Sequence, residues 1–123
     1  MYLEQPSKKY YSDSRMVYSC QYHVIFCSKY RRQVLTEEIS RRLKELILEK
    51  QSEYHYTIIE MEVMLDHVHL LLSVNPKRGI YSVISKIKGY TSRQLREEFP
   101  SLRKKLPTLW TLSKFISSVG AVS

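Results

Sequence analysis

The hydrophobic residues of this chain follow two spacings, one typical of strands and one typical of helices. In residues 16–29 they recur at every second position, as Met16, Tyr18, Cys20, Tyr22, Val24 and Phe26. The polar residues Gln21, His23 and Lys29 fall on the alternate positions. We therefore expect one strand over 16–29, with the apolar set in a core and the polar set on an open face.

Two segments have helical spacing. The first covers 36–51, where Thr36 can act as the N-cap and the apolar positions form one stripe of Ile39, Leu43, Leu46 and Ile47. The second runs from Ile80 to Phe99 and ends before Pro100, with its stripe at Ile80, Val83, Ile84, Ile87, Leu95 and Phe99. Gly89 in its middle predicts a kink or a close packing contact.

Between these helices, residues 54–64 and 68–74 are rich in β-forming residues and predict a tight β-hairpin. If Leu65 and Asp66 form its loop, Glu62 faces His69 on one side of the sheet. The same register pairs apolar residues on the other side: Ile59 with Leu72, Met61 with Leu70, and Val63 with Val68. This agreement between the two alternations supports the register.

The remaining segments complete a β-α-β-β-α-β order. We expect residues 103–105 to form a basic loop and residues 109–119 to form the last strand. This order predicts an α+β fold, a ferredoxin-like split βαβ sandwich with an antiparallel sheet of four to five strands and both helices on one face. The first and third strands would lie at the centre of the sheet. We expect a polar leader over 1–15 and a single domain over 16–123.

Composition and charge narrow the class of partner. Lys and Arg number 20 against 12 Asp and Glu, which gives a net charge of +8 and favours a polyanionic partner such as nucleic acid. Nine of the basic residues lie in 76–105 and six in 1–35, while 36–75 is acidic overall. The sequence has no apolar run long enough to span a membrane and no secretory signal, so we expect a cytoplasmic protein. Cys20 and Cys27 lie too far apart along one strand to form a disulfide.

His67 and His69 form the motif that carries chemistry. A period of two points both imidazoles to one face, where they can share a divalent ion. Glu62 and His23 are candidates to complete the ligand set, because both lie on that face beside the pair. A His-x-His pair is also found as two exposed strand histidines with no ligand, and this interpretation stays open at the level of the motif.

Several stretches, in order, resemble the single-tyrosine HUH transposases of the smallest bacterial and archaeal insertion sequences. The resemblance covers about residues 16–123 and rests on YHVIF at 22–26, KYRR at 29–32, MLDHVHLLL at 64–72, KIKGYTSR at 86–93, LWT at 109–111 and SVG at 118–120. It implies a metal-dependent endonuclease and strand transferase that acts on single-stranded DNA ends folded into hairpins and works as a homodimer.

The resemblance also implies a mechanism. His67 and His69 would hold a divalent ion, Mg²⁺ or Mn²⁺, that polarises the scissile phosphate, and a tyrosine would attack phosphorus to form a phosphotyrosine. No nucleotide cofactor is needed, because the phosphotyrosine conserves the energy of the cleaved bond. We expect phosphate contacts from the two basic blocks, at Arg31, Arg32, Lys86, Lys88 and Arg93.

One expectation concerns the nucleophile. The family places its tyrosine on a helix that follows the SVG segment, and this sequence ends at Ser123. We therefore expect a C-terminally truncated member that holds the metal half of the site, has no catalytic tyrosine and is inactive alone.

Two other classes remain open. A four-stranded sheet with an open face is also the platform of RNA-recognition domains, so a non-catalytic nucleic-acid-binding module is the main alternative. The central strands lack the aromatic-rich stretch that such a domain uses to stack bases. A metal-dependent hydrolase of small phosphates fits the two separated basic blocks poorly.

Overall fold

A computed structural model describes residues 11–13, 16–18 and 20–119 of the chain. Its elements, in order, are β1 (Tyr11–Asp13), β2 (Met16–Tyr18), β3 (Gln21–Cys27), the 3-10 turn η2 (Lys29–Arg31), α1 (Glu37–Glu49), α2 (Gln51–Tyr54), β4 (Tyr56–Val63), β5 (His67–Val74), α3 (Ile80–Glu98), α4 (Pro100–Lys105) and β6 (Phe115–Ser118). Among the described residues, no helix combines the length and the apolar character needed to cross a membrane.

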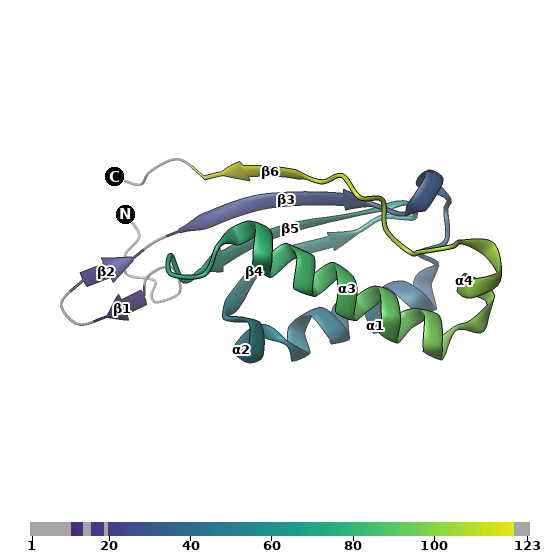
Figure 1. The fold of residues 1–123 in the computed structure, drawn as a ribbon, viewed down its shortest axis with the longest axis horizontal. Coiled ribbons are helices and arrows are strands. Elements are labelled where there is room, and N and C mark those ends of the chain that lie inside the picture. The colour runs from purple at the N-terminus through teal and green to yellow at the C-terminus, as the bar shows by residue number, and fades with distance from the viewer. Residues whose placement is uncertain (1–10, 14–15, 19, 120–123) are drawn as a thin grey trace.

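A four-stranded antiparallel sheet in the order β4-β5-β3-β6 forms one layer, and α1 and α3 cover one of its faces (Figure 1). The predicted α+β class and the placement of the helices on one face are therefore confirmed. The first and third strands of the predicted order, β3 and β5, are the central pair. No helix of the described residues lies on the opposite face of these two strands (Figure 1).

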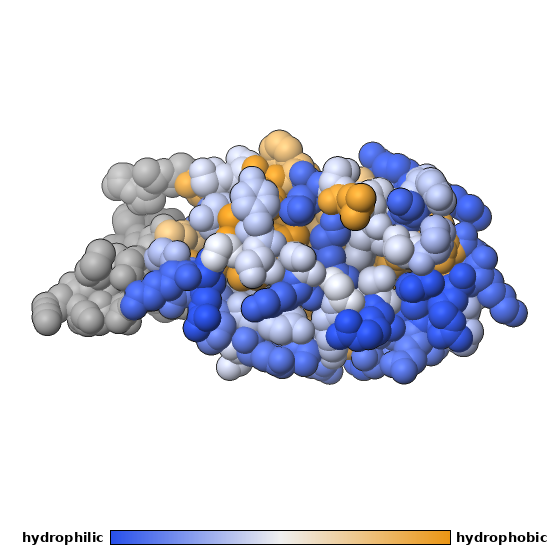
Figure 2. Space-filling view, in the orientation of Figure 1, coloured by the Kyte–Doolittle hydropathy of each residue, from blue (hydrophilic) through white to orange (hydrophobic). Residues whose placement is uncertain are grey.

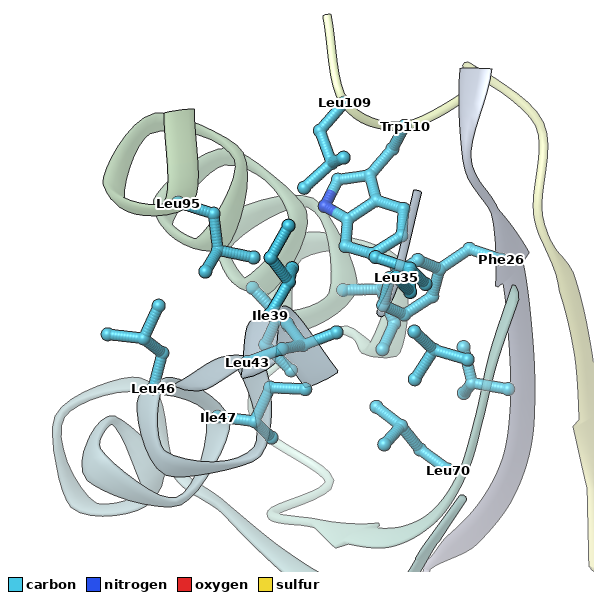
Figure 3. Packing of buried hydrophobic residues seen from close by; sticks show 14 of the residues in the cluster. Phe26, Leu35, Ile39, Leu43, Leu46, Ile47, Leu70, Leu95, Leu109 and Trp110 are labelled. Atoms are coloured by element: carbon cyan, nitrogen blue, oxygen red, sulfur yellow. The ribbon is translucent and has the colours of Figure 1, made fainter. Parts of the chain in front are cut away.

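The core lies between this sheet and the two helices, as Figure 3 shows. The predicted stripe of α1 is buried, and so is the stripe of α3 at Val83, Ile84, Ile87 and Leu95. Phe26 of β3 and the Trp110 indole form a T-shaped pair, with ring centroids 4.7 Å apart. Trp110 donates its indole N–H to the hydroxyl of Thr91, which lies on α3 and is completely buried. Cys20 and Cys27 are free thiols, in agreement with the sequence.

The first strand differs from the prediction. Residues 16–29 do not form one strand, because β2 ends at Tyr18 and pairs with β1 in a separate two-stranded sheet. β3 begins at Gln21, which faces Ser73 near the end of β5. The break has a physical cause: the partner strand β5 ends at Val74, so residues 16–18 have no partner there and pair with β1 instead. β1 lies within the segment expected to be a polar leader, and residues 1–10 lie outside the described part.

The predicted β-hairpin register is correct from Glu60 to Val63, where Glu62 faces His69. It is wrong before that point, because an irregularity at Ile59 shifts the pairing so that Ile58, not Ile59, faces Leu72. An extra residue at a β-bulge reverses the alternation and lets the strand turn apolar residues to the core on both sides of it. Tyr56, buried at the start of β4, donates its hydroxyl to the carbonyl of Ile47 in α1.

Two C-terminal predictions are also corrected. Residues 103–105 belong to the helical turn α4, because Pro100 starts a helix favourably and Leu102 packs into the core. The last strand covers only Phe115–Ser118. Leu109 and Trp110 are buried in the connection before it, where Trp110 forms an isolated bridge with Ser28.

Candidate metal site on the open face of the sheet

His67 and His69 lie on the open face of β5, as the alternation predicts. Val68 and Leu70, between and beyond them, are completely buried on the helix side, whereas both imidazoles are partly exposed. Because β5 is a central strand, its backbone is held by β3 on one side and β4 on the other. The pair is therefore displayed from the most firmly bonded strand of the sheet.

The Asp66 carboxylate holds the ring of His67. His67 Nδ1 lies 2.9 Å from Asp66 Oδ1, and Arg31 pairs with the other oxygen at 3.1 Å. The pKa of Asp66 is lowered from its usual value, first by the hydrogen bond with His67 and then by that with Arg31. Since an ionised carboxylate only accepts hydrogen bonds, the donor in this contact is Nδ1 of His67, and in the neutral ring Nε2 then carries the lone pair. A ring held this way is typical of a metal-ligating histidine.

His69 is held by the neighbouring central strand. Its Nε2 lies 3.1 Å from Nδ1 of His23 on β3, and the two rings are nearly parallel, with centroids 5.3 Å apart. One of the two imidazoles donates to the other. When His69 is the donor, its Nδ1 is left with a lone pair that can bind a metal ion. The expected placement of His23 beside the pair is therefore observed.

Glu62 lies directly across from His69 in the register and is exposed. Together with Glu60, Met61 and His69 it lines a hollow of about 360 Å³. The described residues contain no group of three His, Cys, Asp or Glu side chains that converge on one metal position. The donor set fits a divalent ion through two oriented imidazoles, and completion of the set by Glu62 or His23 stays a prediction.

The basic motif KYRR at 29–32 lies next to this site. η2 brings Arg31 onto Asp66, so the sequence stretches that contain Arg31 and His67 meet in space. Arg32 is exposed, and its guanidinium makes no hydrogen bond or ion pair with any residue in the described part of the chain. From the sequence, Asp66 is predicted as a loop residue and Arg31 as a phosphate contact, and their pairing is not predicted. The signal that could have linked them is the adjacency of Asp66 to His67.

The other predicted phosphate contacts lie on α3, which covers the opposite face of the sheet. Lys88 is half-buried and donates from Nζ to the carbonyl of Thr111 at 2.7 Å, and burial lowers its pKa. Lys86 places its ammonium 5.8 Å from the ring centre of Tyr54, and Arg93 is exposed. The structure thus separates the basic residues into a group beside His67 and a group on α3. Their phosphate contacts stay predictions.

A second hollow of about 330 Å³ lies between α3 and the segment before β6. It is lined in part by Lys88, Gly89 and Trp110. A Cβ atom added to Gly89 would meet nothing within 4 Å, so the close contact predicted for this glycine is absent. Figure 2 shows hydrophobic side chains gathered near β6, above a helical side that is mostly hydrophilic.

Comparisons with known proteins identify the family of this chain. The family model described as "Transposase IS200 like" matches residues 16–123. The ISDra2 transposase TnpA of Deinococcus radiodurans is 40% identical over 106 residues, which cover 85% of this chain and 76% of that protein. The transposase for insertion sequence element IS200 of Salmonella typhimurium is 36% identical over 106 residues, 84% of this chain and 69% of that protein.

Solved structures have the same fold. The crystal structure of a Deinococcus radiodurans protein assigned as a transposase has a TM-score of 0.81 and 33% identity, and the match covers 89% of this chain and 87% of that one. A REP-associated tyrosine transposase bound to a REP hairpin has a TM-score of 0.62 and 16% identity, over 91% of this chain and 64% of that one. The sequence motifs, the sheet that displays His67 and His69, and the family match over 16–123 lead to one conclusion: the chain belongs to the IS200-like transposase family.

Proposed function

We propose that this IS200-like transposase binds single-stranded DNA folded into hairpins and cleaves it with the help of a divalent ion held by His67 and His69. The observation that carries the proposal is the orientation of the two imidazoles on the open face of the sheet. Each ring is held by a partner, Asp66 for His67 and His23 for His69, at 2.9 Å and 3.1 Å. Rings fixed in this way favour ion binding, because little rotamer freedom is lost on binding.

A bound Mg²⁺ or Mn²⁺ would polarise the scissile phosphate and stabilise negative charge on its oxygens. His67 and His69 would hold the ion, and the exposed Glu62 is the candidate for a further ligand. The proposal includes no nucleotide cofactor. The resemblance puts the nucleophilic tyrosine beyond Ser123, so the experiments below measure binding rather than cleavage.

Basic side chains on both faces of the molecule supply the electrostatic part of DNA binding. The sequence predicts phosphate contacts at Arg31, Arg32, Lys86, Lys88 and Arg93. Of these, Arg32 and Arg93 are exposed and their side chains have no partner in the described part of the chain, so the proposal rests mainly on these two. The test compares a DNA hairpin with unstructured RNA of equal length in competition, over a range of salt concentrations. We expect the DNA hairpin to bind more tightly than the RNA. The logarithm of its affinity should fall by about 0.7–0.9 per phosphate contact for each tenfold rise in salt.

An RNA-recognition module would predict the opposite preference. Its sheet needs aromatic side chains on the open face of the central strands. In this protein that face carries Gln21, His23, Ile25 and Cys27 on β3 and His67, His69, Leu71 and Ser73 on β5. None of these is Phe, Tyr or Trp, which favours the transposase proposal. Tighter binding of the RNA would overturn it.

We also propose that the protein works as a homodimer through the β6 edge. Within the described part of the chain, β6 is an edge strand of the sheet and pairs with β3 alone. Phe115 on this strand and Leu112 just before it are 58% and 90% exposed. A free edge with exposed apolar residues is a surface that proteins commonly cover. Sedimentation at tens of micromolar protein should give the mass of a dimer, and a monomer mass would exclude this interface.

A further inference from the structure

Two loops at one end of the sheet are tied together by Ser28, which is completely buried. Its backbone N–H donates to the carbonyl of Asp66 at 3.0 Å, and its hydroxyl donates to the carbonyl of Arg32 at 2.6 Å. The first loop carries the two arginines of the KYRR motif, and the second carries Asp66 and leads into His67. The two loops are therefore joined by hydrogen bonds of Ser28 in addition to the ion pair of Arg31 with Asp66.

The turn that carries Arg31 has an uncommon backbone. Tyr30 and Arg31 both have positive φ angles, 58° and 54°, although neither is glycine or asparagine. The left-handed region disfavours bulky residues, and such conformations persist where the surrounding structure fixes them, often at functional sites. Here the Arg31 N–H donates to the carbonyl of Ser28 at 2.9 Å, which closes the turn.

Arg31 and His67 each form hydrogen bonds with a different oxygen of the Asp66 carboxylate. Arg31 donates from Nε and Nη2 to Oδ2, at 3.2 Å and 3.1 Å, and leaves Oδ1 to the imidazole of His67 at 2.9 Å. The guanidinium thus fixes the rotation of the carboxylate, and the carboxylate fixes the ring. Arg32, the next residue, makes no such contact with the described residues.

We propose that the adjacent arginines have different tasks: Arg31 is a positioning residue that acts through Asp66 on the metal ligand His67, whereas Arg32 contacts DNA phosphate. The inference rests on the proposed function, in which His67 holds the ion. It revises the sequence prediction that gave both residues the same role. The Arg31 side chain is 62% exposed, and exposed ion pairs add little to stability. Replacing Arg31 by alanine should therefore leave the melting temperature almost unchanged, while it changes the tautomer of the His67 ring.

The experiment uses metal-free protein with ¹⁵N-labelled histidine, because imidazole ¹⁵N shifts distinguish protonated from unprotonated ring nitrogens. The wild type should show His67 protonated at Nδ1. Asp66→Ala should convert this single tautomer to a mixture, Arg31→Ala should give a smaller change in the same direction, and the matched control Arg32→Ala should give none. Titration with Mn²⁺ should follow the same order, with a loss of about 10–100-fold for Asp66→Ala and up to about tenfold for Arg31→Ala.

A second measurement, the binding of a DNA hairpin without metal, should be sensitive to Arg32 and insensitive to Arg31. Arg32→Ala should reduce the salt slope by about one phosphate contact, and Arg31→Ala should leave it unchanged. The inference is overturned if Arg31→Ala keeps the wild-type tautomer, or if it lowers the salt slope as Arg32→Ala does. Failure of the wild type to bind Mn²⁺ would instead overturn the metal role of the proposed function, whatever the tautomers show.

Discussion

Replacing Thr91 by valine should destabilise the protein by about 1–3 kcal/mol, because it leaves a buried indole N–H without an acceptor. The Thr91 hydroxyl accepts from Trp110 Nε1 at 3.0 Å and donates to the carbonyl of Ile87 at 2.7 Å. Thr91 is completely buried and Trp110 is 5% exposed, so water cannot replace the lost acceptor without a rearrangement. The carbonyl of Ile87 keeps its partner within α3, so the main cost falls on Trp110.

Urea unfolding followed by circular dichroism measures this cost, and a double-mutant cycle with Trp110→Phe assigns it. Phenylalanine has no N–H, so in that background Thr91→Val should be close to neutral, and the coupling energy should be at least about 1 kcal/mol. Thr91→Ser is the matched control, since it keeps the hydroxyl and removes only a methyl group. Equal costs in the two backgrounds, within about 0.5 kcal/mol, would refute the proposed source of the energy.

Three other changes test the fold. Gly89→Ala should stabilise the protein by up to about 1 kcal/mol in urea unfolding, because α3 gains helix propensity and the added methyl meets nothing within 4 Å; a loss of stability would mean that the space is filled. Leu43→Ala should cost about 2–5 kcal/mol by the same measurement, since Leu43 is completely buried between α1 and the sheet, and a cost below 1 kcal/mol would contradict its place in the core. Burial and the nearby Lys114 lower the pKa of Lys88, so the unfolded state binds more protons above that pKa. The stability of the wild type relative to Lys88→Met should therefore rise as pH rises toward the ordinary lysine pKa of 10.5, and a flat or falling difference would exclude this origin.

Periodicity in the sequence was enough to predict the architecture. The alternation in β5 separates His67 and His69 from Val68 and Leu70, and this separation is local geometry that every strand obeys. The helical spacing of α1 and α3 likewise predicts which residues are buried. The β-α-β-β-α-β order of the elements predicts that β3 and β5 are central, and the alternation places His23 and Glu62 on the face of the two histidines.

The pattern of apolar residues does not predict the bulge at Ile59 or the break before β3, which depend on tertiary structure. A bulge changes the alternation by one residue, and the sequence of β4 contains apolar residues at both Ile58 and Ile59, so either can face Leu72. In the observed register Tyr56 is buried and its hydroxyl donates to the carbonyl of Ile47 in α1. In the same way, the apolar alternation continues through 16–29, and the strand breaks because its partner β5 ends at Val74.

The roles of single basic residues depended most on tertiary structure. Arg31 and Arg32 are identical in the sequence and adjacent, yet one binds Asp66 and the other has a free guanidinium among the described residues. The difference arises from two left-handed residues and from the buried Ser28, whose backbone N–H donates to the carbonyl of Asp66 and so joins two loops far apart in the chain. Periodic patterns determine which face a side chain takes, because that depends on the local backbone. The partner that it meets there depends on where the loops are brought together, and only the folded chain determines that.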